Sequence, residues 1–256
     1  MFEGKTAIVT GGSSGIGAVI ARLLVQQGAN VAIVASSNIE KARQVCKALE
    51  HAAGRCAPFA ADVSSDEAIA RLFDEVERDL QSPDILVNAA GVFYATPVGE
   101  TPAVDAHRLI DINVKGTWNC IQHAAPRMKR RGGGKILNFS SVAGFAVGVK
   151  GFALYCASKA AISAITRVAG AELAPFKINV NALAPGNTAT PMNEAVRTDP
   201  AHAQALENFR LVTPSGVPFS QPEEIAAAAM FLLSPQARAV HGATWLVDEG
   251  LSAAAL

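Results

Sequence analysis

The sequence predicts a three-layer, doubly wound α/β fold in which helices cover both faces of a seven-stranded parallel sheet. Short apolar runs alternate with segments of helical periodicity along the whole chain. Because each intervening helix lets the chain cross back over the sheet, successive strands are expected to pair in parallel. The runs are apolar at consecutive positions, which indicates strands that are buried on both faces.

The expected strands are short runs rich in β-branched and other apolar side chains. They span residues 5–10, 31–34, 56–60, 84–88, 135–139, 178–182 and 244–247. Between them, apolar residues recur at helix spacing, and local signals mark the helix ends: Gly28 stops the first helix, and the Ser-Ser-Asp-Glu cap at 64–67 starts the third. We expect helices over about 16–27, 39–53, 64–80, 102–130, 155–174, 200–211 and 222–233.

No linker-like stretch, internal repeat or low-complexity segment interrupts this alternation, so residues 1–256 are predicted to form one nucleotide-binding domain. The segment 187–220 departs from the pattern, because it holds four prolines and only one expected helix. Long excursions after a strand are usually functional, and we predict that this one is a lid over the substrate.

The composition excludes several classes of partner. Half of the residues are apolar, and 22 basic side chains balance 22 acidic ones. With no net charge, and with Lys and Arg too little clustered to imply otherwise, we expect neither nucleic acid nor an anionic membrane as a partner. The longest apolar stretch, 225–233, is far shorter than the roughly 20 residues of a membrane-spanning helix.

The cysteines and histidines suggest no structural metal. The four cysteines are too few for a disulfide framework and too far apart for Cys-x-x-Cys zinc pairs. The five histidines form no ligand pair at helix or ribbon spacing, so we expect no metal site. No secretory signal is expected either, and together these features favour a soluble protein of the reducing cytoplasm.

A glycine-rich turn follows the first strand. Thr10-Gly-Gly-Ser-Ser-Gly-Ile-Gly17 lies between a strand and a helix, where glycines let the backbone approach a pyrophosphate and the helix start supplies free N–H donors. The same residues match the nucleophile elbow of α/β-hydrolases, with Ser13 as nucleophile. That alternative needs an oxyanion-hole loop from an earlier strand, and only ten residues precede Gly11.

The end of the second strand bears on the choice of nucleotide. A carboxylate there would bind the ribose 2′-hydroxyl of NAD and repel a 2′-phosphate. The stretch is Ala35-Ser-Ser-Asn38, with no acid before Glu40. Ser36 and Ser37 can donate to a phosphate although no arginine clamps it, which favours NADP over NAD.

Tyr155 and Lys159 stand four residues apart at the start of a long helix, so they share one helix face. A nearby ammonium stabilises a phenolate and lowers the pKa of the phenol, ordinarily about 10. The pair alone is also common on protein surfaces. It gains weight from Ser140-Ser141 at the carboxyl end of the preceding strand, the edge where doubly wound sheets bind ligands.

With these pieces, the chain resembles the short-chain dehydrogenase/reductase family over nearly its whole length. The resemblance implies the family's Rossmann fold in a single domain of about this size. The matching motifs occur in the family's order: Thr10–Gly17, Asp62-Val63, Asn88-Ala-Ala-Gly91, Asn113, Ser140-Ser-Val-Ala-Gly144, Tyr155-x3-Lys159, Pro185-Gly186 and Val247-Asp248.

The resemblance implies four catalytic residues. Tyr155 would be the general acid–base, and Lys159 would lower its pKa and hold the nicotinamide ribose. Ser141 would hydrogen-bond the substrate oxygen, and Asn113 would position a water in a proton relay. The implied cofactor-binding residues are Gly11, Ser13, Ser14, Gly15, Ile16, Gly17, Ser36, Ser37, Asp62, Val63, Asn88, Ala89, Gly91, Tyr155, Lys159, Pro185, Gly186, Thr188 and Thr190.

The chain also departs from the family pattern. Ser141 precedes Tyr155 by 14 residues rather than the usual 13, so the loop between them carries one extra residue. Segment 213–221 lacks the usual Gly-Arg before the next helix, which affects lid geometry and substrate choice. Six apolar loop residues are expected either to pack the loops or to line an apolar pocket: Phe93, Tyr94, Phe145, Val147, Phe152 and Met192.

The expected activity is an NAD(P)-dependent interconversion of a secondary alcohol and a ketone, with a small-molecule alcohol or carbonyl compound as the substrate. A 3-oxoacyl-thioester reductase, a non-redox binding protein, and a lyase or dehalogenase on the same fold are the alternatives. The presence of Tyr155, Lys159 and the glycines argues against a non-redox binding protein, and the intact glycine-rich turn argues against a lyase or dehalogenase. By resemblance, the protein would be a homotetramer or homodimer joined through the helices at 102–130 and 154–174.

Overall fold

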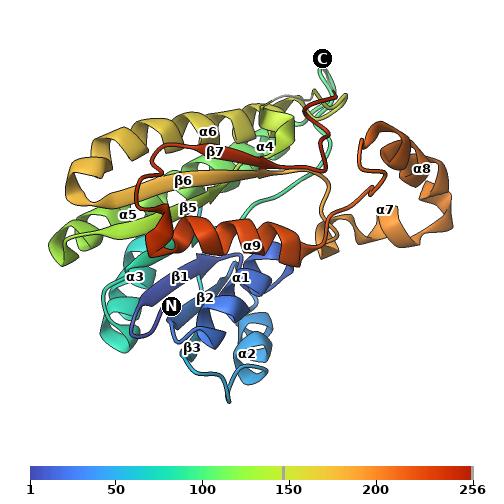
Figure 1. Ribbon diagram of the computed structural model, residues 1–256. Helices are drawn as coiled ribbons and strands as arrows, with labels where there is room; N and C mark the ends of the chain where they lie inside the picture. Colours follow the sequence, from blue (N-terminus) through green and yellow to red (C-terminus); the bar gives the residue numbers. More distant parts are fainter. Residues whose placement is uncertain (146–147, 255–256) are drawn as a thin grey trace.

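The computed structural model describes residues 1–145 and 148–254. Within these residues, seven strands form one parallel sheet in the order β3-β2-β1-β4-β5-β6-β7 (Figure 1). The fold class predicted from the sequence is therefore confirmed. The strands are β1 Thr6–Thr10, β2 Asn30–Ala35, β3 Arg55–Ala60, β4 Ile85–Asn88, β5 Gly134–Phe139, β6 Ile178–Pro185 and β7 Thr244–Val247.

Two helical layers cover the sheet. Successive residues of β1 point to opposite faces: Ala7 and Val9 pack in one apolar core, and Ile8 packs in the other. Helices α1, α2 and α9 contribute to the first core, and α3, α5 and α6 contribute to the second. Burial on both faces explains why the strands are continuously apolar. The helices are α1 Gly15–Gln26, α2 Ile39–Lys47, α3 Asp66–Leu80, α4 Ala103–Ile110, α5 Gly116–Arg131, α6 Ala153–Leu173, α7 Glu194–Thr198, α8 Ala203–Val212 and α9 Pro222–Leu233.

The strand order places a switch point beside β1. From β1 the chain builds β2 and β3 on one side, and then returns to add β4 on the other side. The loops that follow β1 and β4 consequently leave the sheet edge in opposite directions, and a crevice opens between them at the carboxyl ends of the strands. Ligand sites of doubly wound sheets lie in this position.

Two expected helices differ in the structure. The helix expected over 39–53 ends at Lys47, and the chain then turns back toward β3. Gly54 packs directly against the backbone of Ala29, because a Cβ atom on Gly54 would lie 2.1 Å from the Ala29 carbonyl oxygen. This contact brings the chain to the sheet. The helix expected over 102–130 is interrupted by a π-helical stretch, Asp111–Lys115, between α4 and α5.

The segment 187–220 contains more structure than the single helix expected over 200–211. Helix α8 accounts for that expectation, but the short helix α7 precedes it. Helix α7 has only five residues, too few for an apolar periodicity to show in the sequence. Figure 1 shows α7 and α8 beyond the carboxyl end of β6.

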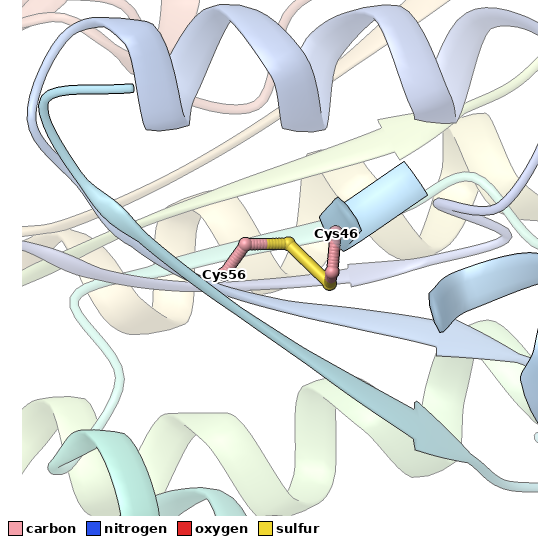
Figure 2. Close-up of a disulfide and its surroundings, with 2 residues drawn as sticks. All are labelled: Cys46 and Cys56. Carbon is pink, nitrogen blue, oxygen red and sulfur yellow. A yellow bond between two sulfur atoms is a disulfide. The ribbon is translucent and has the colours of Figure 1, made fainter. Parts of the chain in front are cut away.

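Cys46 on α2 and Cys56 on β3 form a disulfide, with their Cα atoms 5.3 Å apart (Figure 2). The sequence analysis did not foresee this bond, because the two residues meet only when α2 packs along β3. Cys120 and Cys156 remain free thiols in the structure. Among the described residues, no helix is both long and apolar enough to cross a membrane.

Candidate active site

A cavity of about 1370 Å³ opens at the carboxyl ends of the strands. All of the predicted cofactor-binding residues except Asn88 line it, as do three of the four predicted catalytic residues, Ser141, Tyr155 and Lys159. Residues that are far apart in the sequence therefore converge on one crevice. Among the described residues, no group of three or more His, Cys, Asp and Glu side chains is arranged to hold a metal ion.

The glycine turn after β1 lines the cavity between the residues that follow β2 and those that follow β4. Gly11 adopts φ +65°, and a Cβ atom there would lie 2.7 Å from the Ala89 carbonyl oxygen. A Cβ atom on Gly17 would lie 2.5 Å from the Gly11 carbonyl oxygen. A side chain at either position would close the gap through which a ligand can approach the backbone.

The start of α1 is suited to an anion. Ser14 is its N-cap, yet no side chain caps the first turn, and that turn holds no acidic residue. The N–H groups of the first turn and the positive end of the helix dipole are therefore available to a phosphate. The cradle and the helix start together fit the pyrophosphate of a dinucleotide.

The end of the cavity beyond β2 presents polar side chains. The exposed residues Ser36 and Ser37 line it, and Asn38 uses its side-chain oxygen to cap α2 by accepting from the Glu40 N–H. The Lys41 side chain also lines the cavity. Sequence reasoning missed Lys41, although its place one turn into the helix that follows the second strand was a usable signal.

Asp62 and Val63 line the cavity next to this end. The Asp62 carboxylate accepts hydrogen bonds from the N–H and the hydroxyl of Ser64, at 2.9 and 2.7 Å. These bonds hold the turn after β3 in place. The carboxylate keeps further acceptor capacity for a base or ribose that lies beside it.

Lys159 is nearly fully buried beneath the other end of the cavity. Its ammonium donates to the Phe139 carbonyl at 2.8 Å and lies 5.7 Å from the centroid of the Tyr155 ring. Burial lowers the pKa of Lys159 from 10.5 to about 8, because the charged form loses hydration. A lysine with this pKa exchanges protons near neutral pH.

The Tyr155 hydroxyl differs from the sequence expectation. The sequence analysis expected the ammonium to lower the pKa of Tyr155, but in this structure burial raises that pKa. A side-chain hydrogen bond with Ser141 acts in the opposite direction without overcoming the burial. The phenol is therefore held in its protonated, acid form.

The two adjacent serines have different environments. The Ser140 hydroxyl is buried and bonded to the Lys159 carbonyl oxygen and to the Ser163 hydroxyl, both at 2.8 Å. Ser141 begins the short 3₁₀ helix Val142–Gly144 and lines the cavity beside Tyr155. Ser140 thus anchors α6 to β5, and Ser141 has the environment of a residue that meets a ligand.

Asn113 lies in the π-helical stretch behind the cavity wall. Its side-chain oxygen accepts from the Val92 N–H at 2.8 Å, and its side-chain nitrogen donates to the Val92 carbonyl at 3.0 Å and to the Ser158 hydroxyl at 3.2 Å. A Cβ atom on Gly91 would lie 3.2 Å from the Asn113 side-chain oxygen and 3.8 Å from the Lys159 nitrogen. Asn113 therefore holds the loop after β4 close to Lys159.

The chain is similar to known dehydrogenases and reductases over nearly its whole length. A family model described as enoyl-(acyl carrier protein) reductase matches residues 11–252. The chain is 39% identical to 3beta-hydroxysteroid dehydrogenase 1 of Eggerthella lenta, over 98% of this chain and 95% of that one. It is 36% identical to the 3-oxoacyl-(acyl-carrier-protein) reductase FabG of Staphylococcus aureus strain Mu50, over 96% and 98% of the two chains.

A solved structure has the same architecture. The gluconate 5-dehydrogenase of Burkholderia cenocepacia J2315, in complex with NADP and tartrate, superposes with a TM-score of 0.89 at 33% identity, over 98% of this chain and 96% of that one. The chain belongs to the short-chain dehydrogenase/reductase family. It is an oxidoreductase of the alcohol/ketone type with an NAD(P)-binding fold.

Among the predicted cofactor-binding residues, Asn88 lies outside the cavity. Asn88 was predicted to bind the cofactor, but its side chain is buried in the sheet and donates to the Asn138 side chain at 2.9 Å. Asn138 in turn donates to the Thr166 hydroxyl at 2.9 Å. The prediction for Asn88 is corrected here, because this pair of hydrogen bonds ties β4 to β5 and α6 in place of lining the crevice.

The six apolar loop residues named in the sequence analysis differ in whether they line the cavity. Phe93, Phe152 and Met192 line the cavity. The Tyr94 hydroxyl donates to the Asp105 carbonyl at 2.6 Å, and Phe145 is 58% exposed; neither lines the cavity. Val147 lies outside the described residues. Sequence reasoning missed further lining residues, because helices α4, α7 and α8 bring them from a distance: Val104, His107, Arg108, Val196 and Phe209.

Proposed function

We propose that this protein uses NADP to interconvert a secondary alcohol and a ketone, with Tyr155 as the general acid–base. The observation that carries the proposal is the convergence of Ser141, Tyr155 and Lys159 in the same cavity as the glycine turn. The nicotinamide supplies or accepts the hydride when bound. The protein's own groups handle the proton and the oxygen charge.

In the direction of reduction, the Tyr155 hydroxyl gives its proton to the substrate oxygen. Its raised pKa keeps that proton in place until negative charge develops on the substrate. The Ser141 hydroxyl donates a hydrogen bond to the same oxygen. In the direction of oxidation, the tyrosine takes the alcohol proton back.

Lys159 and Asn113 support this proton transfer. The ammonium stabilises the phenolate that remains after transfer, and a pKa of about 8 lets it pass a proton onward near neutral pH. Its hydrogen bond to the Phe139 carbonyl orients it under the site where the nicotinamide ribose would lie. Asn113 holds the loop above Lys159, and a relay water would lie beside it.

The preference for NADP over NAD rests on the end of the cavity beyond β2. Ser36 and Ser37 supply hydroxyl donors, and Lys41 supplies a cation that can pair with a 2′-phosphate. Glu40, the nearest acid after the strand, is paired with Arg43 on the exposed face of α2. No carboxylate on this stretch is then left to bind a 2′-hydroxyl.

We further propose that residues 1–256 act as one domain, with segment 187–220 as a lid. Val196 and Phe209, from the two helices of that segment, line the cavity, which supports a covering role. A homotetramer or homodimer through α4–α5 and α6 is supported by the exposed apolar side chains Trp118 and Val168 on these helices. Analytical ultracentrifugation of the protein checks the assembly.

The test of the mechanism compares the chain's two tyrosines. Purified protein is mixed with NADPH and a panel of ketones, and absorbance of the reduced nicotinamide is followed. Tyr155→Phe is expected to retain NADPH binding and to lower kcat by about 10²- to 10⁴-fold. Tyr94→Phe, whose hydroxyl bonds the Asp105 carbonyl outside the cavity, is the control and retains kcat. Undiminished turnover by Tyr155→Phe would refute the proposal.

A 3-oxoacyl-thioester reductase remains the second candidate, supported by the 36% identity to FabG. A short 3-oxoacyl thioester in the same assay separates the two candidates by kcat/KM. A non-redox role predicts NADPH binding without turnover of any probe.

A further inference from the structure

Phe93 presents an exposed aromatic ring to the cavity beside the proposed acid–base. Its ring stacks on Phe152, with centroids 4.6 Å apart and the planes 3° from parallel. It meets Tyr155 edge-on, with centroids 4.8 Å apart and the planes at 79°. Although both contacts cover part of it, Phe93 is still 39% exposed. A ligand that packs on the part of the ring that is still exposed removes further apolar surface from water and so gains affinity.

The two stacked rings are held by hydrogen bonds between their loops. The Thr96 N–H donates to the Gly151 carbonyl at 2.7 Å, and the Leu154 N–H donates to the Thr96 hydroxyl at 3.2 Å. On the other side, the Val92 backbone is bonded twice to the Asn113 side chain. The aromatic wall is therefore fixed relative to the tyrosine before a substrate arrives, which lowers the entropic cost of binding.

Much of the rest of this part of the cavity offers hydrocarbon surface, beside the polar side chains of His107, Arg108 and Asn193. Apolar side chains reach it from the loop before α6, from the 187–220 segment and from the C-terminal region: Val149, Met192, Val196, Phe209 and Leu251. A polyhydroxylated acid would leave those hydroxyl groups that meet the apolar side chains without partners, at a cost for each one. A flexible chain would lose torsional freedom when ordered there, whereas a rigid ring loses none.

We infer that the substrate is a carbocyclic compound that bears its secondary alcohol or ketone on the ring, and that Phe93 is the residue that selects the ring. The flat face of the phenyl group packs against the ring while the ring oxygen reaches Tyr155 and Ser141. This inference rests on the proposed alcohol/ketone activity and narrows it to a substrate class.

The test compares two ketones with equal carbon number, the bicyclic 2-decalone and the linear 2-decanone, in NADPH oxidation by the full-length protein. Wild-type kcat/KM is expected to be at least about tenfold higher for 2-decalone. Phe93→Ala is expected to lower kcat/KM for 2-decalone by about 3- to 10-fold, chiefly through KM, and for 2-decanone by less than about twofold. Phe93→Leu, which keeps apolar contact but loses the flat ring, should lie between.

Phe145→Ala is the matched control, because Phe145 is an exposed phenylalanine on the loop after β5 that does not line the cavity. It should leave both kcat/KM values unchanged. NADPH binding by each variant, measured by fluorescence titration, should equal that of the wild type.

Several results would overturn the inference while leaving the proposed activity in place, since NADPH would still be oxidised by a ketone. They are equal wild-type efficiency with the two ketones, equal losses of both in Phe93→Ala, or faster turnover of a keto-sugar acid or a 3-oxoacyl thioester than of 2-decalone. Failure of every probe to be reduced would overturn both the inference and the proposed activity.

Discussion

Replacing Lys159 with methionine is expected to change how the stability of the fold depends on pH. Lys159 is only 7% exposed, and burial lowers its pKa from 10.5 to about 8. The difference between these two values corresponds to about 3 kcal/mol by which the charged lysine destabilises the folded state relative to the neutral lysine. Methionine has a side chain of similar length and carries no charge, so the variant lacks this penalty.

The sign follows from the depressed pKa. Between pH 8 and pH 10.5 the unfolded chain binds more protons at this lysine than the folded chain does, so wild-type stability rises with pH in that window. Below pH 8 the full penalty is present, and above pH 10.5 it is absent. The stability of the variant relative to wild type should therefore fall by about 2–3 kcal/mol between pH 7 and pH 10.

The assay is urea unfolding followed by tryptophan fluorescence at pH 7, 8, 9 and 10, at one protein concentration. Methionine also leaves the Phe139 carbonyl without its donor, which costs about 1–3 kcal/mol at every pH and does not alter the trend. Lys150→Met, at an exposed position, is the control and should track the wild type. Parallel stability curves for Lys159→Met and wild type would refute the assignment of a buried, desolvated ammonium.

Two further predictions concern helix α2. Lys41→Ala should raise KM for NADP by about tenfold and leave KM for NAD within about twofold, as expected for a lost charge-assisted contact with a phosphate; Lys47→Ala, in the last turn of the same helix, should change neither. Equal effects on the two nucleotides would contradict this role for Lys41. Cys46→Ser should lower the free energy of unfolding by about 2–3 kcal/mol through the loop of 10 residues that the disulfide closes, whereas Cys156→Ser should have a small effect. Unchanged wild-type stability after treatment with a reductant would contradict the disulfide contribution.

Much of the fold could be predicted because its signals are local. Apolar runs and helix caps lie within a few residues of the elements that they define, and the helix 222–233 and the strand 244–247 begin and end as expected. The helix over 39–53 was predicted too long, because its end depends on Gly54 packing against the backbone of Ala29. That contact joins separate elements and leaves no periodic trace in the sequence.

The candidate site was predictable where a motif spans a few residues. The glycine turn and the spacing of Tyr155 and Lys159 indicated a nucleotide and a proton-transfer pair, and the structure brings both to one cavity. Asn88 was also predicted to bind the cofactor because it belongs to a motif, but its side chain faces a neighbouring strand. A motif identifies the residue, whereas the direction of its side chain depends on the sheet around it.

Local pattern was therefore enough to predict the parallel sheet and a nucleotide at the glycine turn, and the resemblance to the short-chain dehydrogenase/reductase family predicted the reaction type. Three-dimensional packing decided that Lys41 and Phe93 line the cavity, that Cys46 meets Cys56, and that the pKa of Tyr155 rises. The physical reason is that burial and contact are set by elements remote in the chain. The desolvation of a hydroxyl or an ammonium depends on everything that surrounds it, and spacing along the sequence does not record those surroundings.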